Sequence, residues 1–69
     1  MERVISSNVH SIGHNKDTKI LTVKFIDGGR LYEYYNVSEE TYNNFLNAES
    51  KGKFLDYKIK PYYSYKKVG

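Results

Sequence analysis

The 69-residue sequence contains no cysteine, no tryptophan and a single proline. Without cysteine the chain has no disulfide framework, no thiol nucleophile and no cysteine-ligated zinc site, which fits a reducing compartment. No uninterrupted apolar run exceeds two residues, whereas a membrane-spanning helix needs about 18. No basic segment followed by an apolar stretch opens the chain, so a secretory signal is not expected. These absences predict a soluble, cytoplasmic protein with no membrane partner.

The length of the chain leaves room for one domain, which we expect to span residues 1–69. A domain of this size buries only about 60% of the surface that its unfolded chain exposes. We therefore expect its stability to be small and to depend strongly on each buried contact.

Acidic residues are scarce in the last third of the sequence. Residues 51–67 hold six lysines and one aspartate, a net charge of +5, whereas the other residues hold five basic and seven acidic side chains, a net charge of −2. AT-rich codons explain part of the abundance of lysine and tyrosine but not this uneven placement of the acids. A concentrated positive charge of this kind attracts polyanions.

Residues 18–26 alternate apolar and polar side chains, the pattern of a strand with one buried face. Gly28-Gly29 follows, and two glycines between alternating segments predict a tight two-residue hairpin loop. The pairs that this register places opposite one another match in charge or apolarity: Asp27 with Arg30, Phe25 with Tyr32, Lys24 with Glu33, and Val23 with Tyr34. Tyr32 and Tyr34 are then core or core-rim residues, and Tyr35 lies on the other face.

The segment before this hairpin, residues 3–14, predicts a bent strand. Val9 and Ile12 are three residues apart, so they cannot share one face of a regular strand, and we expect a bulge or bend near Ser11. Residues 15–18 have turn composition and lead into the next strand. The predicted sheet is a meander of three antiparallel strands.

Helical spacing begins after residue 37. Ser38 is the predicted N-cap of a helix whose first turn carries two glutamates. An interruption near Gly52 separates it from a second short helix, which Pro61 ends. The apolar positions at helical spacing are Tyr42, Phe45 and Leu46 in the first helix, and Phe54, Leu55 and Ile59 in the second. The predicted fold is α+β, a three-stranded antiparallel β-meander covered on one face by two short C-terminal helices, with an extended basic tail.

Together these segments resemble the KTSC domain, a module of about this length named for its occurrence at the C-terminus of some lysyl-tRNA synthetases. The resemblance extends from Val4 to Tyr65 and rests on an ordered set of short motifs: Ser6-Ser7, Ile12-Gly13, Tyr32-Glu33-Tyr34, Ala48-Glu49-Ser50-Lys51-Gly52, Phe54, Ile59-Lys60 and Tyr63-Ser64-Tyr65. The departures from the family pattern are His14 for tyrosine, Ser38 for proline, Leu55 for an aromatic residue and Lys60 for arginine. The last departure matters for anion binding, because lysine acts as a point charge and arginine binds phosphate with two parallel hydrogen bonds. The resemblance implies a stand-alone bacterial or phage protein and the RNA binding that has been suggested for the family.

We expect no enzymatic activity, no cofactor and no metal site. His10 and His14 have the spacing of a helical metal site, but Gly13 and the surrounding pattern place them on a strand. Residues 27–30 lack the Lys-Ser/Thr that completes a phosphate-binding loop. The motif residues Ser6, Ser7, Tyr32 and Tyr34 are expected to be structural, with the serines satisfying backbone groups at a bend.

The predicted function is nucleic-acid binding by a Lys- and Tyr-rich C-terminal surface. Lysines neutralise phosphates, and tyrosines outside the core stack on unpaired bases. RNA or single-stranded nucleic acid is favoured over duplex DNA, because no recognition helix is visible. The predicted binding residues are Lys51, Lys53, Lys58, Lys60, Tyr62, Tyr63, Tyr65, Lys66 and Lys67, with Tyr57 also among the interleaved rings.

Two alternatives stay open. In the first, the chain is a protein-protein interaction module that binds a host protein, as a phage-encoded protein would, or forms a homodimer. Its basis is the abundance of tyrosine, which is enriched at interface hot spots. Alternatively, the tail is a solvated edge strand whose lysines prevent aggregation.

Overall fold

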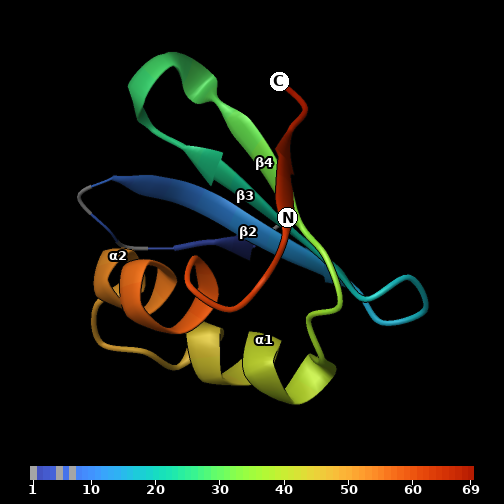
Figure 1. Ribbon diagram of the computed structural model, residues 1–69. Coiled ribbons are helices and arrows are strands. Elements are labelled where there is room, and N and C mark those ends of the chain that lie inside the picture. Colours follow the sequence, from blue (N-terminus) through green and yellow to red (C-terminus); the bar gives the residue numbers. More distant parts are fainter. Residues whose placement is uncertain (1, 5, 7) are drawn as a thin grey trace.

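The computed structural model describes residues 2–4, 6 and 8–69 of the chain. Among these residues, five antiparallel strands form one sheet in the order β1-β2-β3-β4-β5, and the helices pack against one face of it (Figure 1). The strands are β1 (Glu2–Arg3), β2 (Val9–Asn15), β3 (Ile20–Phe25), β4 (Leu31–Tyr34) and β5 (Tyr65–Lys67). The helices are α1 (Glu39–Leu46), α2 (Lys51–Phe54), its π-helical continuation η2 (Leu55–Ile59), and the short 3-10 turn η1 (Asp27–Gly29). None of the described helices is long and apolar enough to cross a membrane.

The α+β class and the two helices on one face agree with the prediction, but the count of three strands is wrong. The segment predicted as one bent strand divides into β1 and β2, which pair with each other. The predicted extended tail is strand β5, which pairs with β4 although more than 30 residues separate them in the sequence (Figure 1). The open edge of β4 offers unpaired backbone groups, and an adjacent extended segment satisfies them by pairing.

The hairpin between β3 and β4 has a longer loop than predicted. Val23 pairs with Tyr32, and the Phe25 N–H donates to the Arg30 carbonyl at 2.8 Å, so the loop consists of residues 26–29. Pairing of Phe25 with Arg30 is favourable because the guanidinium lies 5.8 Å from the centroid of the Phe25 ring, a cation-π contact. The register is shifted by two residues, so every side chain keeps its predicted face.

The bend predicted near Ser11 is confirmed. Val9 pairs with Phe25 and Ser11 pairs with Lys24, which leaves His10 as an extra residue on β2. This β-bulge turns the strand so that Val9 and Ile12 are both fully buried.

The buried core lies between the sheet and the helices. It contains Val9, Ile12, Leu21, Val23, Phe25, Tyr34, Val37, Phe45, Leu55 and Ile59. The predicted N-cap is confirmed, since the Ser38 hydroxyl accepts from the Thr41 N–H at 3.1 Å. Ser50 caps α2 in the same way by accepting from the Lys53 N–H. Gly52 was expected to interrupt the helices but lies inside α2.

The structure describes three of the four motif residues, Ser6, Tyr32 and Tyr34. Tyr34 is 1% exposed and Tyr32 packs against the core as a partly buried side chain. The Ser6 hydroxyl accepts from the backbone N–H groups of Asn8 and Val9, both at 3.3 Å, and so satisfies the backbone before β2. Ser7 lies outside the described residues.

Candidate functional site

Tyr32 of β4 and Tyr65 of β5 stack on the sheet face that carries the core. Their ring centroids are 5.8 Å apart and their planes are parallel within 1°. Tyr65 is opposite the buried Tyr34 in the β4-β5 register, yet its own side chain is 59% exposed. Tyr65 therefore has a largely exposed aromatic ring that is supported by contacts with Tyr32 and, at a centroid distance of 5.6 Å, with Tyr34.

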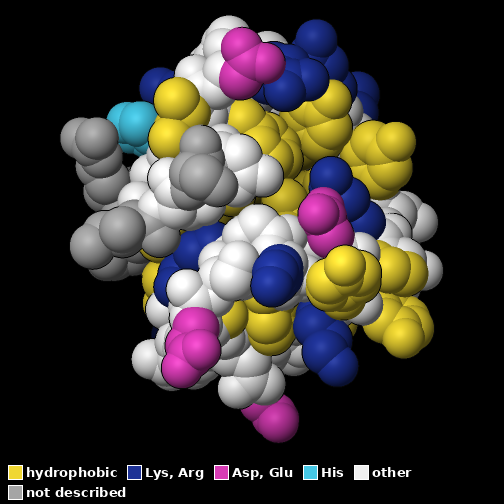
Figure 2. Space-filling view, turned by 90° about the vertical axis from the view of Figure 1, so that its left-hand side faces the viewer, with side chains coloured by type: hydrophobic (Ala, Val, Ile, Leu, Met, Phe, Trp, Pro, Cys, Tyr) yellow, Lys and Arg dark blue, Asp and Glu magenta, His cyan; other side chains and the backbone are white. Residues whose placement is uncertain are grey.

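The stacked tyrosines continue into the β3-β4 hairpin. The Phe25 ring meets the edge of Tyr32 at a centroid distance of 5.5 Å, and Arg30 lies over Phe25. Lys67 is opposite Tyr32 on β5, and Lys60 follows η2. We call these residues the aromatic-cationic surface: Phe25, Arg30, Tyr32, Lys60, Tyr65 and Lys67. Figure 2 shows Lys and Arg side chains gathered around exposed hydrophobic side chains in the upper right of this face.

A recess of about 290 Å³ lies in this surface, between the hairpin and the end of η2. It is lined by Asn8, Phe25, Asp27, Arg30, Tyr32 and Lys60. Two aromatic rings form apolar walls, two cations lie at the rim, and one amide and one carboxylate supply hydrogen-bonding groups. This combination of apolar walls with a few polar groups is typical of ligand sites.

Two carboxylates moderate the positive charge of this surface. Lys60 Nζ lies 3.1 Å from Asp56 Oδ1, and Arg30 Nη2 lies 3.7 Å from Asp27 Oδ2. All four side chains are about half exposed or more, and exposed ion pairs contribute little free energy. An incoming anion can therefore compete with either carboxylate for its cation.

The pKa of Tyr34 is affected by its burial and by its charged or ionisable neighbours. Burial, together with smaller electrostatic contributions from Tyr32, Tyr65 and Asp56, raises the pKa of Tyr34 to about 12. Asp56 of η2 is thus close enough to the tyrosine cluster to act on it electrostatically. The phenol of Tyr34 is neutral at physiological pH, and its buried ring packs against the exposed ring of Tyr65.

The predicted binding residues divide into those that join this surface and those that do not. Lys60, Tyr65 and Lys67 belong to it. Tyr57 and Tyr62 are 69% and 75% exposed on η2 and on the turn after it, and Lys53 and Lys58 are exposed on the same helical segment.

Three predicted residues lie outside this surface. Tyr63 packs against the core, with its hydroxyl 3.4 Å from Thr41 Oγ1. Lys51 donates to the Ala48 carbonyl. Lys66 is opposite Glu33 and points to the other face of the sheet.

Asn8, Phe25 and Arg30 join this surface although they lie outside the predicted C-terminal set. The uneven charge of the sequence points to the residues after position 50, whereas Arg30 belongs to the part of the chain with net negative charge. The hairpin supplies Phe25 and Tyr32 to the surface. A pairing of β5 with β4 would have revealed this, since it brings Tyr65 and Lys67 beside Tyr32.

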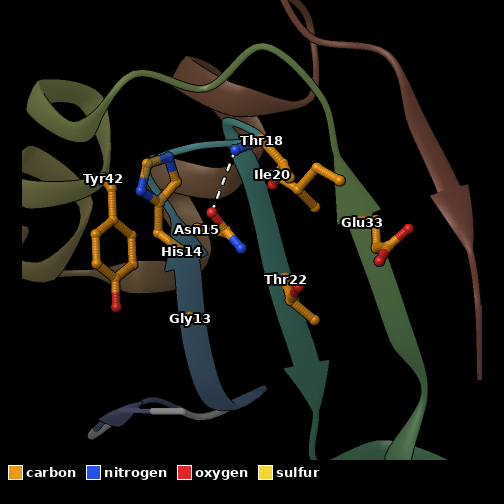
Figure 3. A pocket seen from close by; sticks show the side chains of 8 residues that line it. All are labelled: Gly13, His14, Asn15, Thr18, Ile20, Thr22, Glu33 and Tyr42. Atoms are coloured by element: carbon orange, nitrogen blue, oxygen red, sulfur yellow. Dashed lines mark hydrogen bonds between the residues drawn. The ribbon is translucent and has the colours of Figure 1, made fainter.

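A larger hollow, of about 680 Å³, has a different character (Figure 3). His14 and Tyr42 lie at one end of it, and Ile20, Thr22 and Glu33 lie toward the other. His14 is engaged, with Nε2 2.6 Å from the Val37 carbonyl oxygen and its ring stacked on Tyr42 at 5.0 Å. The described residues that line this hollow include Glu33 and no Lys or Arg, so the hollow does not favour an anionic ligand.

Comparison with known proteins identifies the family. The model of the KTSC domain matches residues 5–63. The chain belongs to the KTSC domain family. It is 38% identical over 61 residues to a protein of Tsukamurella paurometabola, covering 88% of this chain and 90% of that protein. It is 35% identical over 71 residues to a protein of Stutzerimonas stutzeri, covering 99% of each.

The solved structures give the same answer. The crystal structure of a KTSC domain protein from Yersinia pestis matches with a TM-score of 0.92 and 38% identity, over 99% of this chain and 94% of that one. The four residues named above as departures have defined surroundings in the structure: Ser38 caps α1, Leu55 is fully buried, His14 contacts the Val37 carbonyl, and Lys60 lines the recess.

Proposed function

We propose that this KTSC domain binds single-stranded nucleic acid, with RNA favoured, through the aromatic-cationic surface. The observation that carries the proposal is the exposed Tyr65 ring, stacked on Tyr32 and flanked by cations from three elements of the fold. An unpaired base stacking on such a ring contributes about 1 to 3 kcal/mol. Arg30, Lys60 and Lys67 then neutralise the neighbouring phosphates.

The form of the surface supports a single strand over a duplex. Bases inside a duplex are stacked on one another and do not offer a free face to Tyr65. Duplex readers insert a recognition helix into the major groove, whereas α1 carries Glu39 and Glu40 in its first turn. Those carboxylates would meet phosphates with the same sign of charge.

The test is a fluorescence-anisotropy titration of the protein with short labelled RNA, once as a single strand and once annealed to its complement. The proposal expects tighter binding of the single strand, with an affinity that falls as salt rises. With three cations engaged, the slope of log affinity against log salt is about −2, from roughly −0.7 per phosphate. Binding that ignores salt, or that favours the duplex, would contradict the proposal.

One further observation favours a second candidate, a protein-protein interaction through the edge of β5. The Tyr35 N–H donates to the Ser64 carbonyl, and the Val68 N–H donates to the Leu31 carbonyl. The backbone groups of residues 64, 66 and 68 therefore face β4, and those of Tyr65 and Lys67 face outward. An open edge of this kind accepts an extended strand from a host protein or a second copy, although lysines on an edge also discourage such pairing.

Lys67→Pro separates the two candidates. Proline removes an outward N–H without removing a bond to β4, so it blocks strand addition. If the second candidate holds, the variant no longer forms the dimer or the complex that sedimentation velocity detects for the wild type. If nucleic-acid binding holds, the variant loses only the contribution of the Lys67 charge.

A further inference from the structure

The recess beside Tyr32 has the size and lining of a site for one planar group. Its volume of about 290 Å³ is just below the range of about 300 to 1,000 Å³ for sites that hold drug-sized ligands, which suits a single small ring. Phe25 and Tyr32 meet at an interplanar angle of 76°, so they form a corner with apolar sides. A heteroaromatic ring fits such a corner better than an extended peptide does.

Asn8 is an exposed polar side chain at this corner. The Asn8 side-chain Oδ1 accepts from the Ser6 hydroxyl at 3.0 Å. The Asn8 backbone carbonyl accepts from the Ile26 backbone N–H at 2.9 Å. The Ser6 bond places Oδ1 on the Ser6 side and leaves the Nδ2 amide protons and a second Oδ1 lone pair for a ligand.

Gly52 of α2 lies against the Asn8 amide. A Cβ atom at position 52 would lie 2.9 Å from Asn8 Oδ1 and 3.3 Å from Asn8 Nδ2. Only glycine lets α2 pass this close without moving the amide. Ser6 and Gly52 together therefore position Asn8 at the recess.

Cations lie where the backbone of a bound nucleotide would leave the recess. Arg30 and Lys60 line it from the hairpin and from the end of η2. Tyr32 forms one wall of the recess and also stacks under Tyr65. A strand with one base on Tyr65 thus places an adjoining nucleotide next to the recess.

We infer that the recess binds one unpaired adenine, with the Asn8 amide hydrogen bonding to its polar edge. This inference rests on the proposed function and names the base that the surface selects. An asparagine amide presents a donor beside an acceptor, the complement of the N6 amino group and N7 of adenine. The Asp27 carboxylate at the rim adds an acceptor for an amino group and disfavours uracil, which has a carbonyl at the corresponding position.

The experiment compares labelled oligo(A) and oligo(U) of equal length by fluorescence anisotropy. The variants are Asn8→Ala, Gly52→Ala, and the control Asn44→Ala, which removes an exposed asparagine from α1. We expect the wild type and the control to prefer oligo(A) by at least about fivefold. We expect Asn8→Ala and Gly52→Ala to bring the ratio close to one, with oligo(U) affinity and the salt slope retained.

A second readout is the side-chain amide resonance of Asn8 in ¹⁵N-labelled protein, which we expect oligo(A) to shift and oligo(U) to leave in place. If both oligonucleotides bind and Asn8→Ala leaves their ratio unchanged, the adenine site is wrong and the proposed function stands. If neither oligonucleotide binds, both are wrong.

Discussion

Lys66 and Lys67 are neighbours in the chain but lie on opposite faces of the sheet. Lys67 is opposite Tyr32, beside the stacked tyrosines, and Lys66 is opposite Glu33. The alternation of a strand produces this separation, and it provides a pair of variants that remove the same charge from two different surfaces.

We predict that Lys67→Ala weakens single-strand binding several-fold and makes the salt slope shallower by about 0.7. Lys66→Ala should leave both nearly unchanged, because its ammonium faces away from the bound strand. Anisotropy titrations at several salt concentrations measure affinity and slope together. Equal losses in the two variants would show that only the net charge of the chain matters.

The ion pair between Lys60 and Asp56 leads to a prediction of tighter binding. Asp56→Asn removes the carboxylate that competes with phosphate for Lys60. Affinity for the single strand should therefore rise by about 1.4- to 5-fold, because an exposed ion pair is worth about 0.2 to 1 kcal/mol. Glu40→Gln, in the first turn of α1, changes the net charge by the same amount and is the control. A gain in Glu40→Gln as large as that in Asp56→Asn would contradict a local role for Lys60.

Stability in alkali follows from the buried phenol. The pKa of Tyr34 in the folded protein is raised to about 12 from 10.0, so the folded state holds its proton more tightly than the unfolded state does. The contribution of this pKa difference to the free energy of unfolding is fully present below pH 10 and is lost as the pH rises through 12. The total loss is about 2 to 3 kcal/mol.

Denaturant unfolding between pH 8 and pH 12 measures this loss, and Tyr34→Phe removes the titrating group. We expect the free energy of unfolding of the variant to fall less steeply above pH 10 than that of the wild type. Parallel curves would mean that Tyr34 titrates normally in the folded state.

The local features of the fold were predictable from short sequence patterns. The alternation around Val23 gives the strand and its buried face, the spacing of Val9 and Ile12 gives the bulge, and Ser38 before two glutamates gives the start of α1. Each depends on residues within a few positions of one another, so local stereochemistry decides it.

The features that were missed depend on distant residues. The hairpin register was chosen by matching charge and shape, and the cation-π contact of Arg30 with Phe25 was not considered. Strand β5 has three residues, too few for a periodic signal, and only its pairing with β4 shows that it is a strand. The approach of Asn8 to Gly52 joins the first and last thirds of the chain, and no pattern within either third indicates it.

The central claim is that the exposed ring of Tyr65 stacks on an unpaired base. The most direct test is the affinity for a short single-stranded RNA of Tyr65→Ala, Tyr65→Phe and the control Tyr35→Ala, whose ring lies on the opposite face near Glu33. Loss of the ring should weaken binding about 5- to 150-fold, from about 1 to 3 kcal/mol of stacking, while Tyr65→Phe and Tyr35→Ala bind like the wild type. An unchanged affinity in a folded Tyr65→Ala protein would contradict the account.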